Sequence, residues 1–259
     1  MSKNAIITWA SGKNFINNIG VDIFLKSLRH NFEGDILVFS HDMHQKEKFE
    51  KYNCNIINVN PENIETVVRD RFYGYLEHMD IWEKYEKVLV VDIKDVLFQI
   101  NPFSLDFGDL ALCAEGGNHW QSTFNCLDQT KFQMNISRFS RQFMNWPIIN
   151  AGVIYGDPKS VASILNTIWL CAISSTNSSD QAALNYIANA TPLKFTCVLP
   201  QKLPYCATGE GISKNWIDVD FFQGQVLFKG YSNPLPYTMI HQWERTVFKN
   251  ELIEKWIKM

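Results

Sequence analysis

The sequence predicts an α/β protein with a mixed, mostly parallel central sheet flanked by helices. Its 259 residues are 46% hydrophobic and 14% aromatic, which is enough for one large core. Through the first third of the chain, apolar runs of strand length alternate with segments of helical spacing. This alternation is typical of a doubly wound parallel sheet.

The first part of the chain contains four predicted strands, identified by short apolar or β-branched runs between polar segments. They cover residues 5–9, 35–40, 55–59 and 87–92. Between them we expect three helices, because apolar residues recur there every three or four positions. These cover residues 15–32, residues 46–52, and a helix that opens at Pro61, where a proline suits the first helical position.

The second part of the chain is less regular. Strands are predicted at residues 109–114, 148–155, 195–199 and 226–229. Helices are predicted from Asp157-Pro158, from a Ser179-Asp180 cap to Ala190, and over residues 243–258. Residues 115–144 are polar with weak periodicity, so we expect an irregular segment there. No repeat or linker interrupts the chain, which favours a single domain over residues 1–259.

Composition excludes several classes of function. The net charge is −3 with acidic and basic residues interspersed, so no nucleic-acid partner is expected. No stretch approaches 18 apolar residues, so no membrane span is expected, and the N-terminus lacks the apolar core of a signal peptide. The six cysteines form no C-x-x-C pair, which indicates a reducing, cytoplasmic setting. Without a G-x-G-x-x-G or Walker loop, a dehydrogenase or P-loop NTPase is not expected.

The strand at residues 87–92 ends on Asp92, and Asp95 follows three positions later. Ligands of such sheets gather at the carboxyl ends of the strands. A turn after Asp92 would bring the two residues within about 7 Å, so both carboxylates can face one hard cation. A turn former or cap is the alternative for either acid. Two acids at this edge suit a metal bound to a substrate diphosphate, and hence nucleotide-sugar chemistry.

Weaker signals point to a nucleotide in the first half. The segment Thr8-Trp9-Ala10 follows the first strand and offers an aromatic ring for a base beside small residues, although Trp9 fits core packing equally well. Arg69 and Arg71 precede the acidic strand and are candidates to meet a phosphate or base. A solvated helix face paired to nearby acids is an equal alternative.

Four segments, taken in order, resemble a known family. They are Val91 to Gln99 with Asn101-Pro102-Phe103, Ile149 to Val153, Ser179 to Asn185, and Ile240 to Arg245. Together they resemble the GT-A-fold glycosyltransferases, most closely a branch related to family 8 with an Asp-x-Arg/Lys-Asp element. The resemblance spans roughly residues 5–245.

The resemblance implies a role for each matching residue. Asp92, Asp95 and His241 would hold Mn²⁺ or Mg²⁺, and Asp92 would also meet the donor ribose or diphosphate. The residues that would line the donor sugar and acceptor side are Asn150, Ala151, Gly152, Asp180 and Gln181. Residues 1–100 would form the nucleotide-binding half and residues 101–259 the acceptor and sugar half.

One position departs from the family pattern. Lys94 stands where the commoner Asp-x-Asp element has its second acid. Whether Asp95 takes over as a ligand, and whether metal is needed, stays open at this point. Lys94 is itself a candidate to neutralise phosphate charge.

Glycosyl transfer explains why such residues are required. Breaking the bond from sugar C1 develops positive charge on the sugar and negative charge on the leaving phosphate. Stabilising that phosphate is mainly electrostatic, for which a cation or Lys94 would serve. An inverting enzyme also needs a base within about 3 Å of the acceptor hydroxyl, and Asp180 is the candidate. A retaining enzyme needs no such base.

The sequence therefore predicts a metal-assisted glycosyltransferase that uses a UDP- or GDP-sugar and a glycan or glycoconjugate acceptor. A sugar-1-phosphate nucleotidyltransferase is the nearest alternative, although Ala10-Ser11-Gly12-Lys13 only faintly matches its glycine-rich loop. An inactive nucleotide-sugar-binding module is the other alternative, supported by Lys94. His119 lies among polar residues and is expected at the surface. Glu115 follows a strand, where contact with an acceptor is the alternative to the surface position that we expect.

Overall fold

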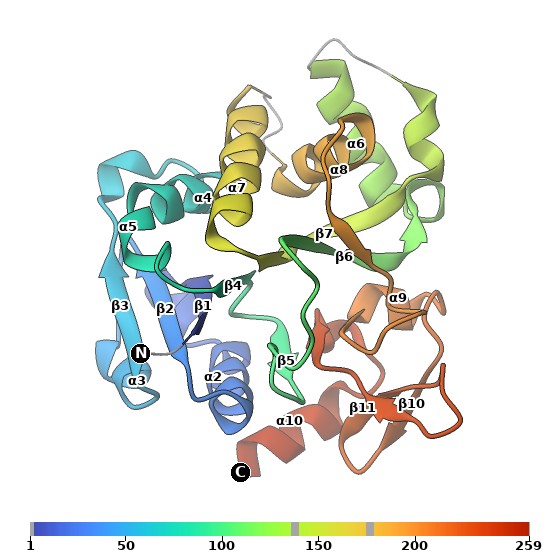
Figure 1. The fold of residues 1–259 in the computed structure, drawn as a ribbon. Helices are drawn as coiled ribbons and strands as arrows, with labels where there is room; N and C mark the ends of the chain where they lie inside the picture. The colour runs from blue at the N-terminus through green and yellow to red at the C-terminus, as the bar shows by residue number, and fades with distance from the viewer. Residues whose placement is uncertain (1–2, 136–139, 175–178, 259) are drawn as a thin grey trace.

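The computed structural model describes residues 3–135, 140–174 and 179–258, which are built around a seven-stranded sheet (Figure 1). The strand order is β3-β2-β1-β4-β7-β6-β8. The strands are β1 (Asn4–Trp9), β2 (Asp35–Ser40), β3 (Cys54–Asn58), β4 (Lys87–Val91), β6 (Leu110–Asn118), β7 (Pro147–Gly156) and β8 (Thr196–Val198). The predicted mixed, mostly parallel sheet is confirmed.

Strand β7 is the one strand of this sheet that runs against its neighbours. Strands β3, β2, β1 and β4 pair in parallel, β7 lies antiparallel between β4 and β6, and β6 is parallel to β8. Val91 pairs with Val153, and the Asp92 N–H donates to the Gly152 carbonyl (3.0 Å). The register therefore places the middle of β7 beside the carboxyl end of β4.

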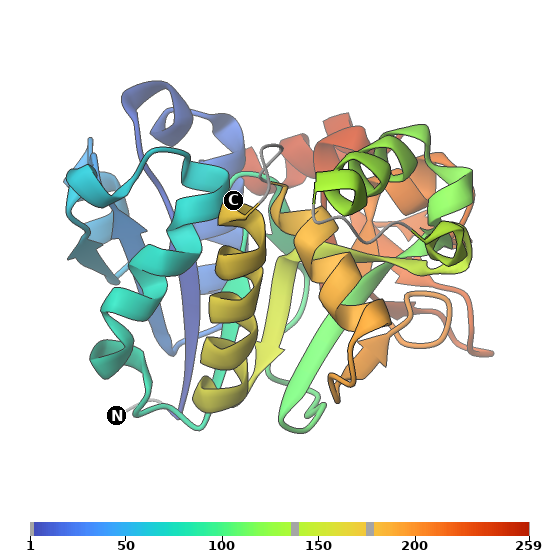
Figure 2. The same cartoon turned by 90° about the horizontal axis from the view of Figure 1, so that it is seen from above.

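Helices cover both faces of the sheet because successive strand residues point to opposite sides. Val88 and Val90 belong to a core under α4 (Val67–Glu77), α7 (Pro158–Ile173) and α8 (Asp180–Ala190). Leu89 and Val91 belong to a second core under α2 (Ile19–Asn31). Figure 2 shows α4, α7 and α8 side by side across their face of the sheet.

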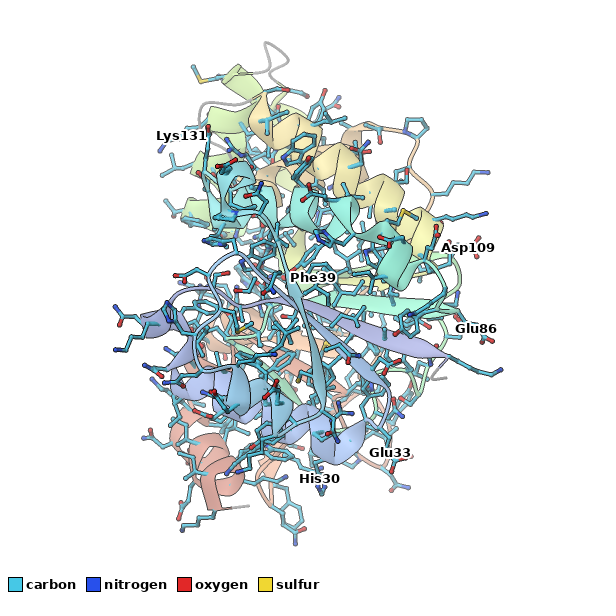
Figure 3. All side chains as sticks on the ribbon, turned by 90° about the vertical axis from the view of Figure 1, so that its left-hand side faces the viewer. His30, Glu33, Phe39, Glu86, Asp109 and Lys131 are labelled. Carbon is cyan, nitrogen blue, oxygen red and sulfur yellow. The ribbon has the colours of Figure 1, made fainter. Side chains whose placement is uncertain are left out.

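Two small sheets complete the fold. One contains β5 (Val96–Phe98), β13 (Met239–His241) and β9 (Cys206–Thr208), with β13 in the middle. The other contains β10 (Val219–Phe222), β11 (Gln225–Phe228) and β12 (Leu235–Pro236). Because β5 begins one residue after Asp95, the first of these sheets lies directly beside the acid pair. Figure 3 shows Glu86 and Asp109, which precede β4 and β6, together at one end of the molecule; the acid pair lies at the opposite end of β4.

The first half differs from prediction at two helix starts. The helix expected over residues 15–32 is divided into α1 (Lys13–Ile16) and α2, because the Asn18 side chain accepts the Gly20 N–H and caps a new helix. Pro61 opens a 3-10 turn (Pro61–Asn63), and α4 begins at Val67. The Asp70 carboxylate accepts the Glu65 and Thr66 N–H groups, which lie just before the first residue of α4, and so stabilises the start of this helix.

The segment expected to be irregular, residues 115–144, continues β6 and then forms α6 (Thr123–Asn135). This helix was missed because its pattern is partly inverted: Phe124 and Leu127 are exposed, whereas Gln129 and Gln133 are fully buried beside Phe132. The helix predicted over residues 243–258 is a 3-10 turn (Trp243–Arg245) followed by α10 (Lys249–Lys258).

The remaining elements are short, and strands of two to four residues are too brief for a periodic signal. The short helices are α3 (Lys46–Glu50), α5 (Met79–Trp82), α9 (Gly209–Ser213) and the 3-10 turns His119–Gln121 and Arg141–Asn145. Within the described residues, no helix has the length and apolar character needed to cross a membrane.

Candidate active site

Asp92, Asp95 and His241 meet at the carboxyl end of β4. Their nearest ligand atoms all lie within 4.8 Å of one another. His241 Nε2 is 3.6 Å from Asp92 Oδ2 and 3.3 Å from Asp95 Oδ1. The two acids are separated by a turn, and β13 brings the imidazole from the far end of the chain. We call these three residues the acid–histidine cluster.

The acid–histidine cluster attracts positive charge. Burial opposes protonation of His241, yet Asp95 and Asp92 outweigh it and hold its pKa well above the usual value. Two carboxylates and one imidazole in this arrangement are also a suitable ligand set for a divalent cation, since carboxylate oxygens suit Mg²⁺ and Mn²⁺. The residues present therefore fit the predicted metal site.

Gly152 allows this convergence. A Cβ at this position would lie 2.5 Å from Asp92 Oδ2 and 2.5 Å from His241 Cε1, closer than real Cβ contacts. The Asn150 side-chain oxygen accepts the Gly152 N–H (2.8 Å), which holds the strand in place. Only a residue without a side chain can pass between these two ligands, which explains the glycine of the Asn-Ala-Gly segment.

Arg71 joins the acid–histidine cluster to Asp180. Its guanidinium contacts Asp92 through Nη1 and donates through Nη2 to Asp180 Oδ2 (2.8 Å). Burial disfavours its charge, but the two carboxylates raise its pKa overall. Burial alone would raise the pKa of Asp92, but the positive charges of Arg71 and His241 outweigh it and hold this pKa below its usual range. Arg69 instead pairs with the buried Asp70 and the exposed Glu65.

Asp180 begins α8 but is not its N-cap, which corrects the predicted Ser179-Asp180 cap. The Ser179 side chain accepts the Ala182 N–H (3.1 Å), and Ser179 is the N-cap. The Asp180 side chain accepts the Gln181 N–H (2.7 Å) and faces Arg71. Burial raises the pKa of Asp180, and Arg71 only partly offsets this.

Glu115 is buried, contrary to the prediction of a surface acid. Its carboxylate accepts from the side-chain amides of Asn150 (2.8 Å) and Gln181 (3.2 Å), and Gln181 also donates to Asn125 (2.8 Å). Burial raises the pKa of Glu115. His119 is also buried rather than exposed, with its Nδ1 3.1 Å from the Trp146 carbonyl.

Three adjoining hollows form a cleft across these residues. The hollow on the β1 side has a volume of about 180 Å³ and is lined by Trp9, Phe15, Val67 and Lys94 together with Arg71 and the two acids. The middle hollow, of about 230 Å³, contains the acid–histidine cluster and the Asn150-Ala151-Gly152 segment. The third, of about 480 Å³, is lined by Val68 and Phe124 and by ten polar side chains: Glu115, Ser122, Asn125, Asp128, Ser179, Asp180, Gln181, Glu210, Gln242 and Arg245.

Two predicted nucleotide residues lie behind the cleft rather than on its lining. The Thr8 hydroxyl is fully buried and donates to the Val91 carbonyl (2.7 Å), which ties β1 to β4. Ala10 is fully buried in the core under α2. Trp9 lines the β1-side hollow and also packs edge-on against Tyr75 in the core.

Sequence reasoning missed Asn125 and Arg245 as lining residues. Glu115 directly follows the apolar run 110–114, and from that position a contact with an acceptor was considered, but a surface position was preferred. Asn125 lies on the partly inverted helix α6 and gave no signal. Gln242 has a left-handed backbone (φ 57°), which turns the chain sharply after His241.

No protein-family profile and no curated protein matches this sequence. Among solved structures, the galactosyltransferase LgtC in complex with donor and acceptor sugar analogues has a TM-score of 0.60 with 16% identity, covering 98% of this chain and 94% of that chain. An active-site variant of LgtC, with a glutamine replaced by glutamate, has a TM-score of 0.62 with 16% identity, covering 98% and 95%. The likeness confirms the predicted GT-A fold.

Proposed function

We propose that this protein is a glycosyltransferase that moves a sugar from a nucleotide-diphosphate sugar to a hydroxyl of a glycan or glycoconjugate. The observation that carries the proposal is the acid–histidine cluster, located between a small aromatic hollow and a larger polar hollow at the carboxyl edge of a GT-A sheet. LgtC, which has the same fold, was crystallised with donor and acceptor sugar analogues. A cleft with two unlike compartments suits a reaction between two such substrates.

The two compartments suggest how the substrates divide. The β1-side hollow, from residues 1–100, would take the nucleoside, with Trp9 beside the base and Lys94 beside the phosphates. The 480 Å³ hollow, lined by Val68 and otherwise by residues from 101–259, would take the transferred sugar and the acceptor, because its lining offers amides and carboxylates to hydroxyl groups. A UDP- or GDP-sugar fits this division, and the two halves would act as one domain.

Asp92, Asp95 and His241 would hold Mn²⁺ or Mg²⁺, which would neutralise the diphosphate as it leaves. The imidazole favours Mn²⁺ over Mg²⁺, since Mg²⁺ prefers oxygen ligands. Lys94 lines the hollow next to both acids and would add positive charge near the same phosphates. Gly152 keeps the ligands close to β7, so the sugar would lie against Asn150 and Ala151.

Asp180 would face the reacting sugar. It lines both the middle and the 480 Å³ hollows, and Arg71 holds its carboxylate toward the acid–histidine cluster. In an inverting reaction it would accept the proton of the acceptor hydroxyl; in a retaining reaction it would bind a sugar hydroxyl. Gln181, fixed by Glu115 and Asn125, would bind a neighbouring hydroxyl.

A reducing compartment such as the cytoplasm suits the chain. All six cysteines are unpaired, and three of them are buried.

The test is hydrolysis of UDP-, GDP- and dTDP-sugars with and without Mn²⁺. A transferase slowly releases the nucleoside diphosphate, a nucleotidyltransferase releases pyrophosphate, and a binding module releases neither. The place of His241 in the acid–histidine cluster favours the transferase over the nucleotidyltransferase. Lys94 at the usual second-acid position keeps the binding module as the rival. Release of pyrophosphate, or of no product from any donor, would overturn the proposal.

A further inference from the structure

A separate hollow of about 410 Å³ lies between the C-terminal parts of α6 and α8. Its polar and aromatic lining is Gln133, Ser140, Gln142, Trp146, Tyr186 and Asn189. Among the described residues that line it, none is acidic or basic. Its volume lies within the range of small-ligand sites. We call it the amide hollow.

The chemistry of the amide hollow suits a neutral polyhydroxylated ligand. Each side-chain amide both donates and accepts, so it can pair with the hydroxyl groups along the edge of a sugar ring. One face of a pyranose carries mainly C–H groups, which pack against an aromatic ring such as Trp146 or Tyr186. A charged ligand would find no opposite charge among these side chains.

Unpartnered buried amides provide a second, independent observation. Gln133 is fully buried; its Oε1 accepts the Ser140 N–H (2.8 Å), but its Nε2 has no partner among the described residues. Of the two, only Gln133 lines the amide hollow; Gln129, one turn earlier, is also fully buried without a partner among the described residues, but it lies outside the lining. Leaving a buried polar group unpaired costs folding free energy, so native proteins normally pair such groups with another protein group or with ordered water, and a bound ligand can take the same place.

Two rows of amides connect the amide hollow to the cleft. One row on α6 is Asn125, Gln129 and Gln133, and a row at the same spacing on α8 is Gln181, Asn185 and Asn189. Gln181 donates to Asn125, whereas the Asn185 side chain pairs with the backbone of Ile149 in β7. Figure 1 shows α6 and α8 packed together. The first member of each row lines the 480 Å³ hollow and the last lines the amide hollow. Eight helical residues correspond to a rise of about 12 Å, which separates the two sites.

We propose that the amide hollow binds a neutral saccharide unit and acts as a second carbohydrate subsite for the acceptor. The binding itself follows from the lining, the unpartnered amides and the absence of charge among the described lining residues. The role as an acceptor subsite rests on the proposed function. Two helices that each present amides at both sites would hold a distal sugar at a fixed distance from the reacting one.

The test is titration of the full-length protein with lactose, maltotriose, cellotriose and chitotriose, followed by NMR of side-chain amide signals. At least one probe is expected to shift the Gln133 and Asn189 signals. Trp146→Leu and the exposed Gln142→Ala are each expected to weaken that binding at least tenfold. The matched control is Trp169→Leu, which alters a partly buried tryptophan in a hollow lined by charged residues between α4 and α7 and should leave binding unchanged.

The outcomes separate this inference from the proposed function. No binding of any probe, or wild-type binding in both Trp146→Leu and Gln142→Ala, overturns the subsite. Donor hydrolysis measured on the same samples tests the transferase independently. Hydrolysis without saccharide binding removes the subsite and keeps the transferase. Saccharide binding without hydrolysis supports the site and overturns its role as an acceptor subsite.

Discussion

Replacing Gly152 by alanine would insert a methyl group into the acid–histidine cluster. The new Cβ would lie 2.5 Å from both Asp92 Oδ2 and His241 Cε1, whereas ordinary contact begins at 3.4 Å. The shortfall is 0.9 Å, the difference between those two distances. Neither neighbour can retreat easily, because His241 is buried in the middle of a three-stranded sheet and Asp92 is held by Arg71.

This displacement would exceed the tolerance of a metal site several times over, since ligand distances hold to within about 0.2 Å. We expect Gly152→Ala to weaken Mn²⁺ binding at least tenfold and to reduce donor hydrolysis by about a hundredfold, in line with a misplacement of about 1 Å. Crowding would also destabilise the fold by about 1–3 kcal/mol. Isothermal titration with Mn²⁺, urea unfolding and nucleoside-diphosphate release measure the three effects.

Gly156→Ala, in the same strand, provides the matched control. Its Cβ would meet the Asp109 carbonyl oxygen at 2.2 Å, so it crowds the far end of β7 and leaves the acid–histidine cluster untouched. We expect a comparable loss of stability with wild-type Mn²⁺ affinity. If Gly152→Ala binds Mn²⁺ and hydrolyses the donor like wild type, the assignment of the cluster as the metal site is wrong.

Three further predictions concern single carboxylates. Asp95→Asn should abolish the Mn²⁺ stimulation of donor hydrolysis with an unchanged circular dichroism spectrum; retained stimulation would exclude Asp95 as a ligand. Asp180→Asn should lower transfer about a hundredfold yet barely alter urea stability, because burial already disfavours its charge, whereas Ser179→Ala should lose about 1 kcal/mol of stability as the true cap. Glu115 has a raised pKa, so the folded state binds its proton more tightly than the unfolded state and loses stability as the pH rises from the unfolded pKa through the folded one. Glu115→Gln should therefore gain stability relative to wild type in urea unfolding as the pH rises above the ordinary glutamate pKa of 4.5, and a pH-independent difference would contradict the burial argument.

The sequence predicts best those strands whose residues are apolar on both faces of the sheet. Residues 88–91 are apolar throughout because alternate side chains enter the two cores above and below the sheet. A run of this kind needs no knowledge of its neighbours to be recognised as an inner strand. Asp92 and Asp95 were found for a similar reason, since a strand end and a turn are local features.

The parts that were missed depend on partners far away in the chain. Glu115 is buried because Asn150 and Gln181, from β7 and α8, satisfy its carboxylate. Helix α6 was missed because it buries the amides of Gln129 and Gln133 beside Phe132 and exposes Phe124 and Leu127, so its inward face is not a continuous apolar stripe. The position of His241 was expected only through a family resemblance, since nothing near residue 241 in the sequence indicates which strand it joins.

Hydrogen bonds between backbone groups also link the segments that carry the residues of the acid–histidine cluster. Asp95 leads directly into β5, where Val96 pairs with His241, and the Trp243 N–H donates to the Asp95 carbonyl (3.3 Å). On the other side of β13, His241 pairs with Thr208, whose hydroxyl donates to the Glu115 carbonyl (3.2 Å). A shift of β13 would therefore move both the His241 imidazole and Asp95 relative to Asp92. A cation bound by all three ligands would link the end of β4 to the sheet formed by β5, β13 and β9. Metal binding and the packing of the C-terminal segment against β4 would therefore stabilise each other.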